Sequence, residues 1–133
     1  MKNLFLSIFV LLMVFSCTTL SNISKVGSKQ VPISNTQWTL AESVKGKTPT
    51  LILENNKISG NAGCNNYFGN LVLDTTAGNF SVSNIGSTEM MCDNMETEAN
   101  FLSMLREANK YVVNGNTLEL YKNNLLLMKF TKL

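Results

Sequence analysis

The sequence contains no histidine among its 133 residues. This absence excludes Ser-His-Asp and Cys-His nucleophilic chemistry, and it excludes metal sites that rely on imidazole ligands. A Ser-x-x-Lys nucleophile pattern and a phosphate-binding Gly-x-x-x-x-Gly-Lys loop are also missing. Glu96 and Glu98 are two positions apart on an expected helix, so their carboxylates do not face each other. We therefore predict a protein that is not an enzyme and needs no cofactor; an enzyme using Asp, Glu, Lys or Tyr is the less favoured alternative.

Excess charge of one sign is absent as well. The chain has 11 Lys and Arg residues against 9 Asp and Glu residues, and Lys2 lies in a segment that we expect to be removed. Nucleic-acid binding requires a basic surface that neutralises phosphates, so no nucleic-acid partner is predicted. About 117 residues would remain after removal of the first 16, which suits one domain with its own core.

The N-terminus has the pattern of a secretion signal. Lys2 is followed by an uncharged run from Leu4 to Phe15, which is too short to span a bilayer core of roughly 20 apolar residues. The run ends in Val14-Phe15-Ser16-Cys17, which resembles the lipobox of bacterial lipoproteins. We predict a signal peptide over residues 1–16 and a lipid anchor on Cys17; an ordinary secretion signal that is cut elsewhere is the alternative.

Lipid attachment would make the membrane the first partner, because each buried methylene contributes about 0.8 kcal/mol and several acyl chains together anchor stably. Thr18 and Thr19 follow the cysteine, and in bacterial lipoproteins the lack of an acidic residue there resembles the pattern for outer-membrane retention. We therefore expect an outer-membrane lipoprotein that faces the periplasm. Residues 17–36 are rich in Ser, Thr, Asn and Lys, which predicts a flexible tether before a domain at 37–133.

Apolar alternation and turn residues predict a mainly β domain. The expected strands are residues 37–40, 50–54, 57–60, 68–73, 79–85, 111–113, 117–121 and 125–130. Asn114-Gly115 between two of them is a strong hairpin signal. One helix is expected over residues 95–107, with Asp93 as its cap and Glu96 completing a capping box. The prediction is a curled antiparallel sheet, or a small barrel-like β domain, with one packed helix.

Several motifs occur in a characteristic order. Gly60-x-x-Gly63-Cys64-Asn65 is followed by Ser87-Thr88-x-Met90-x-Cys92 and then by a helical motif, with flanking apolar motifs upstream and downstream. The helical motif is Glu98-x-x-Phe101-x-x-x-Leu105, and the flanking motifs are Trp38-x-Leu40 and Gly115-x-x-Leu118-x-Leu120. Together they resemble the META domain, the HslJ-like family of heat-shock-associated envelope proteins, over most of residues 37–130. The resemblance implies a mostly β domain with one helix, often lipid-anchored, linked to stress and antibiotic tolerance, and it supplies no catalytic residue.

Cys64 and Cys92 remain once Cys17 carries lipid. An even pair in an oxidising compartment favours a disulfide, although two free buried thiols stay possible. Met90, Met91 and Met95 surround Cys92, so a soft Cu(I) site is a further alternative to methionines that fill the core.

A candidate binding surface comprises Asn65, Asn66, Tyr67, Ser87 and Thr88, because amides and hydroxyls form hydrogen bonds and a ring can stack. Turn formation alone would also explain the asparagines. The favoured hypothesis is a monomeric lipoprotein that withstands envelope stress by binding an envelope protein or polymer. A carrier of a small hydrophobic ligand is the alternative, since curled sheets can enclose ligands.

Overall fold

The computed structural model describes residues 25–133, so the signal, Cys17 and the first part of the expected tether lie outside the described residues. Eight antiparallel strands form a closed barrel in sequence order, and β1 closes it by pairing with β8. The strands are β1 (Thr36–Leu40), β2 (Thr50–Leu53), β3 (Lys57–Asn61), β4 (Asn66–Asp74), β5 (Asn79–Ser87), β6 (Lys110–Asn114), β7 (Thr117–Lys122) and β8 (Leu125–Lys132). One helix, α1 (Glu96–Glu107), connects β5 to β6. The predicted fold class and all eight expected strands are confirmed.

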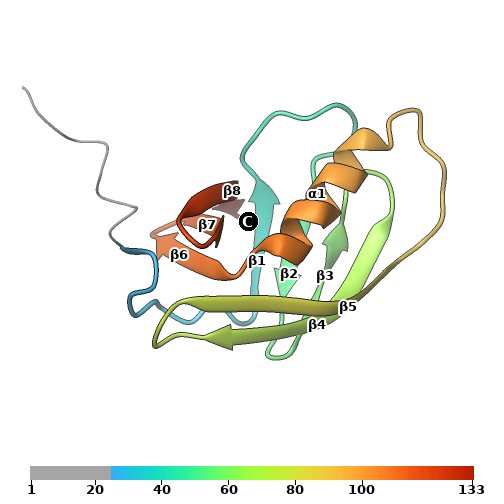
Figure 1. Cartoon of the computed structure of the whole chain (residues 1–133). Coiled ribbons are helices and arrows are strands. Elements are labelled where there is room, and N and C mark those ends of the chain that lie inside the picture. Colours follow the sequence, from blue (N-terminus) through green and yellow to red (C-terminus); the bar gives the residue numbers. More distant parts are fainter. Residues whose placement is uncertain (1–24) are drawn as a thin grey trace, which may run out of the picture.

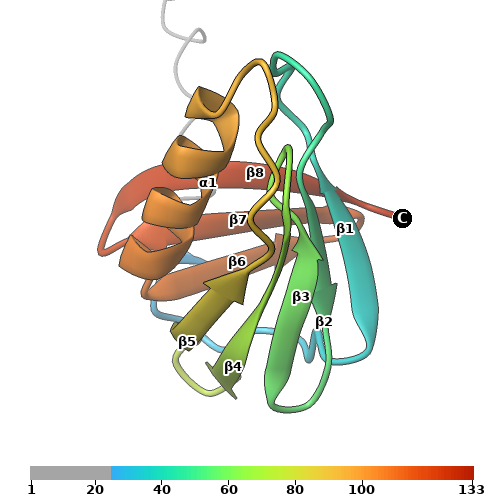
Figure 2. The ribbon, with the colours of Figure 1, turned by 90° about the vertical axis from the view of Figure 1, so that its right-hand side faces the viewer.

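The barrel is weakest between β5 and β6, where the register pairs only Asn79 with Lys110. The chain from β5 to β6 runs through α1, which packs against the side of the barrel (Figure 1; Figure 2). Phe101, Leu102 and Leu105 of α1 are buried, and they join the core. The helix thus covers apolar surface that the splayed strands would otherwise leave open to water.

The interior of the barrel is filled with side chains. Buried residues alternate along β1 and β2, as the two-residue repeat of a strand requires, whereas β7 buries four consecutive residues, Leu118 to Tyr121. The Phe101 ring lies 5.6 Å from the Tyr67 ring and 6.4 Å from the Phe130 ring, centroid to centroid. The largest fully buried side chains include Trp38, Tyr67, Phe80, Phe101, Tyr111 and Phe130.

The expected tether is shorter at its C-terminal end than the sequence suggests. Gln30 is buried, its amide donates to the Thr75 carbonyl at 2.8 Å, and its side-chain oxygen accepts from the Val113 amide at 3.0 Å. Ile33 is part of the core. The boundary at residue 37 is therefore wrong, because two isolated residues in a polar stretch dock onto the barrel without any strand periodicity.

The helix is confirmed, but its predicted cap is wrong. The helix begins at Glu96, the preceding residue Met95 makes no side-chain cap, and Asp93 is exposed. The Asn94 side-chain oxygen accepts from the Glu96 amide at 3.1 Å, which satisfies one of the free amides of the first turn. Glu96 itself occupies the first helical position, so it cannot close a capping box with Asp93.

Candidate functional site

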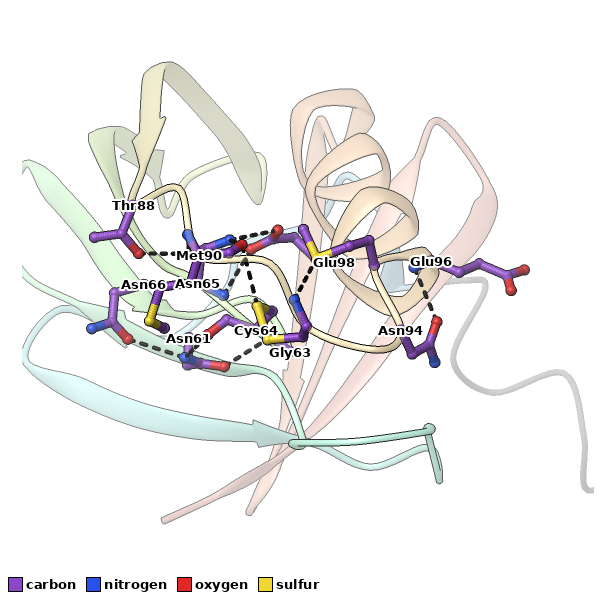
Figure 3. Close-up of a disulfide and its surroundings, with 12 residues drawn as sticks. Asn61, Gly63, Cys64, Asn65, Asn66, Thr88, Met90, Asn94, Glu96 and Glu98 are labelled. Atoms are coloured by element: carbon purple, nitrogen blue, oxygen red, sulfur yellow. Dashed lines mark hydrogen bonds between the residues drawn. A yellow bond between two sulfur atoms is a disulfide. The ribbon is translucent and has the colours of Figure 1, made fainter.

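A buried hydrogen-bond network connects the Gly/Asn-rich turn before β4 with the loop before α1 (Figure 3). Asn65 stands at its centre and is 2% exposed. Its side-chain oxygen accepts from the Met90 amide at 2.6 Å and from the Thr88 hydroxyl at 2.9 Å. Its side-chain nitrogen donates to the Met90 carbonyl at 3.0 Å. The amide of a single side chain thereby fixes the path of residues 88–90.

Glu98 of α1 completes the network from the other side (Figure 3). One carboxylate oxygen accepts from the Asn65 backbone amide at 2.9 Å, and the other accepts from the Asn65 side-chain nitrogen at 3.0 Å. Glu98 is buried although it carries a carboxylate. Both of its oxygens therefore accept from one residue, and the carboxylate holds α1 to the turn.

The turn itself is fixed by Asn61 and Gly60. The Asn61 side chain accepts from the Gly63 amide at 2.9 Å and donates to the Asn66 side-chain oxygen at 3.1 Å. Gly60 has a φ of +153°, and a Cβ there would lie 2.2 Å from the Thr50 carbonyl oxygen. Only glycine allows this approach of β3 to the start of β2.

A disulfide joins Cys64 in the turn to Cys92 in the loop before α1, with Cα atoms 6.0 Å apart. These are the two cysteines that the sequence pairs. Because both sulfurs are bonded to each other, neither is a thiolate that could bind Cu(I) in this state. Among residues 25–133, no group of three or more His, Cys, Asp or Glu side chains could hold a metal ion.

The predicted binding surface divides into buried and exposed parts. Asn65 and Tyr67 are buried, which corrects their assignment to the surface. The Tyr67 hydroxyl donates to the Thr50 carbonyl at 2.7 Å, and burial raises the pKa of its phenol well above the ordinary value. Asn66, Ser87 and Thr88 are exposed, and the Thr88 amide donates to the Asn66 carbonyl at 3.0 Å. The correction follows from strand alternation, because β4 begins at Asn66 and its next residue faces the core.

An exposed aromatic ring, which the sequence assigns only to a strand, stands beside Asn66. Phe68 is 60% exposed. A Cβ on Gly86 of β5 would lie 2.8 Å from Cζ of Phe68, so the ring rests directly on the glycine backbone. We call the exposed side chains of Asn66 and Phe68 the Phe68 surface. Ser87 pairs with the core-facing Tyr67, so its side chain lies on the opposite face of the strand pair, and the Thr88 hydroxyl is bonded to Asn65. The Phe68 surface borders a shallow groove lined by Lys47, Thr50, Ile52, Ser59, Gly60, Asn61, Asn66, Tyr67 and Phe68.

A second depression of about 370 Å³ lies between α1 and the loop after β1. Leu40, Val44 and Pro49 line it from the loop side, and Phe101 and Met104 line it from the helix. The Thr97 hydroxyl donates to the Lys45 carbonyl at 3.1 Å, which ties the loop to α1. This depression has the size of a small-molecule pocket, at the lower end of the usual range.

The sequence gives only part of the information needed to predict the roles of Glu98 and Phe68. Glu98 belongs to the helical motif quoted above, but a helical position alone does not tell whether a carboxylate is buried. Phe68 occupies an alternate position from Tyr67, which puts the two rings on opposite faces of one strand. The alternation was visible, but the sequence does not reveal which of the two faces is the core.

The geometry of residues 25–133 defines a class of protein: a small closed β-barrel in which helix α1 is pinned by a buried amide–carboxylate pair and a disulfide. The META domain family model matches residues 31–132, and the chain belongs to that family. An NMR structure of a protein from Burkholderia xenovorans has a TM-score of 0.64 at 24% identity and covers 75% of this chain and 83% of that one. A second NMR structure has a TM-score of 0.57 at 19% identity, with 74% and 89% covered. These likenesses show the fold alone, and no curated protein matches the chain.

Proposed function

We propose that this protein is a non-enzymatic lipoprotein that helps the bacterial envelope to withstand stress by binding an envelope protein or polymer. The single observation that carries the proposal is the Phe68 surface, where an exposed aromatic ring lies beside the exposed side-chain amide of Asn66. Aromatic rings with polar neighbours are favoured at binding surfaces because they supply large contact area and directed hydrogen bonds. Membership of the META domain family agrees with an envelope role.

The filled interior of the barrel supports binding at the surface over storage of a ligand inside. Trp38, Tyr67, Phe80 and Phe101 occupy the space that a barrel-type carrier would give to its ligand. The polar groups of the interior are also used by the fold, since Glu98 and Asn65 bond each other. Recognition therefore falls to side chains that point outward.

The proposed surface can be tested by crosslinking in intact cells, followed by purification of the tagged protein. We expect a crosslinked product from the parent protein and its loss in Phe68→Ala. Leu125→Ala is the matched control, because Leu125 of β8 is 64% exposed and lies outside the Phe68 surface. Equal crosslinking by Phe68→Ala and the parent protein would overturn the assignment of this surface.

The proposed location is the outer membrane, with Cys17 as the lipid-bearing residue and the domain facing the periplasm. In the described part of the chain, residues 25–133, no helix has the length and apolarity needed to cross a membrane. Cys17→Ser should abolish labelling by a radioactive fatty acid and move the protein to the soluble fraction. Membrane retention that does not change with this substitution would refute the anchor.

A second candidate function, transport of a small hydrophobic ligand, is favoured by the depression beneath α1. Its apolar lining by Leu40, Val44, Phe101 and Met104 could hold such a ligand against the helix. Binding of an environment-sensitive naphthylamine dye would test this function. Val44→Asp should abolish the dye signal if the depression is the site, and an unchanged signal would exclude it.

A further inference from the structure

The loop between β5 and α1 is rich in methionine, and two of its methionines are exposed. Three of the seven methionines of the chain, Met90, Met91 and Met95, lie in this loop. Met91 is 86% exposed and Met90 is 57% exposed, whereas Met128 of β8 is 1% exposed. An exposed thioether gains nothing from burial, so packing in the core does not explain the two methionines at positions 90 and 91.

Hydrogen bonds and the disulfide fix the backbone of this loop on both sides of Met90 and Met91. On one side, the Met90 amide and carbonyl are both bonded to the Asn65 side chain. On the other side, Cys92 is tied to Cys64 by the disulfide, and the Cys92 amide donates to the Met95 sulfur at 3.5 Å. The anchors use backbone groups and the neighbouring residues, so the Met91 side chain extends into solvent and more than half of Met90 is exposed, although the backbone around them is fixed.

We propose that Met90 and Met91 form a reversible oxidation site for hypochlorous acid and related two-electron oxidants. The thioether sulfur would donate an electron pair to the oxidant and take its oxygen atom. The sulfoxide forms as chloride leaves and the proton is released to solvent. A methionine sulfoxide reductase would reverse the step with two thiols, which become a disulfide while the oxygen leaves as water.

The other sulfur atoms of the described residues should react with the oxidant more slowly than Met90 and Met91. Cys64 and Cys92 are already oxidised to a disulfide. Met128 lies in the core, where a new polar oxygen would lack a partner. Met95 and Met104 are partly buried. Since susceptibility follows exposure, the oxidant should reach Met91 first and Met90 next.

The site would act without unfolding the domain. A sulfoxide at Met90 or Met91 places its oxygen in water, and the backbone bonds of Met90 to Asn65 stay in place. The exposed pair is equally open to a repair enzyme, which needs access to the sulfoxide. This inference depends on exposure and anchoring alone, so it stands apart from the partner proposed for the Phe68 surface.

The experiment uses the mature chain with Cys17→Ser and an intact disulfide, exposed to limiting hypochlorous acid. Peptide mass spectrometry should show an added oxygen at Met91 and Met90 before any at Met104 or Met128, with no change in the thermal midpoint. Methionine sulfoxide reductase with its thiol donor should then remove both oxygens. The variant Met90→Leu with Met91→Leu should consume the oxidant more slowly, whereas Met104→Leu should not.

Three outcomes would overturn the proposal. Oxidation of Met104 or Met128 as early as Met91 would show that exposure does not select the site. A fall in the thermal midpoint when only Met90 and Met91 carry oxygen would show damage rather than a tolerated modification. Failure of the reductase to restore the thioethers would remove reversibility.

Discussion

The pairing of Glu98 with Asn65 gives a sharp test of what holds the helix to the barrel. Glu98→Ala would remove the acceptors of the Asn65 backbone amide and side-chain nitrogen, both of which are buried. A buried donor left without a partner costs about 1–3 kcal/mol. Some water would enter the space of the lost carboxylate, so we expect the free energy of unfolding to fall by about 2–4 kcal/mol. At a urea dependence of about 2 kcal/mol/M, the midpoint should drop by about 1–2 M.

Glu96→Ala is the matched control, because Glu96 lies in the same helical turn and is exposed. Its loss should cost only about 0.3–1 kcal/mol, the usual contribution of a negative charge near a helix N-terminus. Glu98→Gln retains one oxygen acceptor and should give an intermediate value. If Glu98→Ala destabilises the protein no more than Glu96→Ala in urea unfolding at neutral pH, the network does not hold α1 in place.

Three further predictions concern the cap, the disulfide and one surface carboxylate. Asn94→Ala should lower the free energy of unfolding by about 0.5–2 kcal/mol in the same urea assay. Asp93→Ala should change it by no more than about 0.5 kcal/mol, and a larger loss would restore Asp93 as the cap. Replacing Cys64 and Cys92 together by alanine should cost about 3–4 kcal/mol, as expected for a crosslink across a sequence separation of 28 residues. Hydrogen bonds from the Thr76 hydroxyl and amide lower the pKa of Asp74 below the ordinary value of 3.8. The stabilisation from this carboxylate is therefore complete above pH 3.8 and is lost as the pH falls through the lower folded-state pKa, and an NMR titration should show a higher Asp74 pKa in Thr76→Ala.

The strands could be predicted because each carries its own periodic pattern and is bounded by turn residues. Trp38 and Leu40 alternate with polar residues in β1, and both are buried. The Asn114-Gly115 turn also forms as expected, with Gly115 at a φ of +59°. Closure of the sheet is a different matter, because pairing of β1 with β8 joins segments from opposite ends of the domain. Local patterns predict the faces of the strands and the turns between them. They do not determine whether the first and last strands pair, and so they do not distinguish an open curled sheet from a closed barrel.

The helix start could not be placed by its motif alone. Asp93 and Glu96 have the spacing of a capping box, but the disulfide at Cys92 ties the preceding loop to the turn at Cys64. Asn94 then reaches the free amide of Glu96 instead. A local capping signal competes here with a tertiary crosslink, and the position of the first helical turn follows the crosslink.

The asparagines show why a polar, turn-rich segment does not by itself mark a binding site. Asn61 and Asn65 would serve equally well to bond a ligand, yet the fold uses their amides to join β3, the loop at Met90 and α1. An amide buried in this way is no longer available to a partner, because its donors and acceptors are already satisfied. The same network holds the surrounding backbone still and leaves Phe68, Met90 and Met91 pointing into solvent. Apolar side chains kept exposed on a fixed backbone are the groups that packing does not account for, so recognition and oxidation should first be sought there.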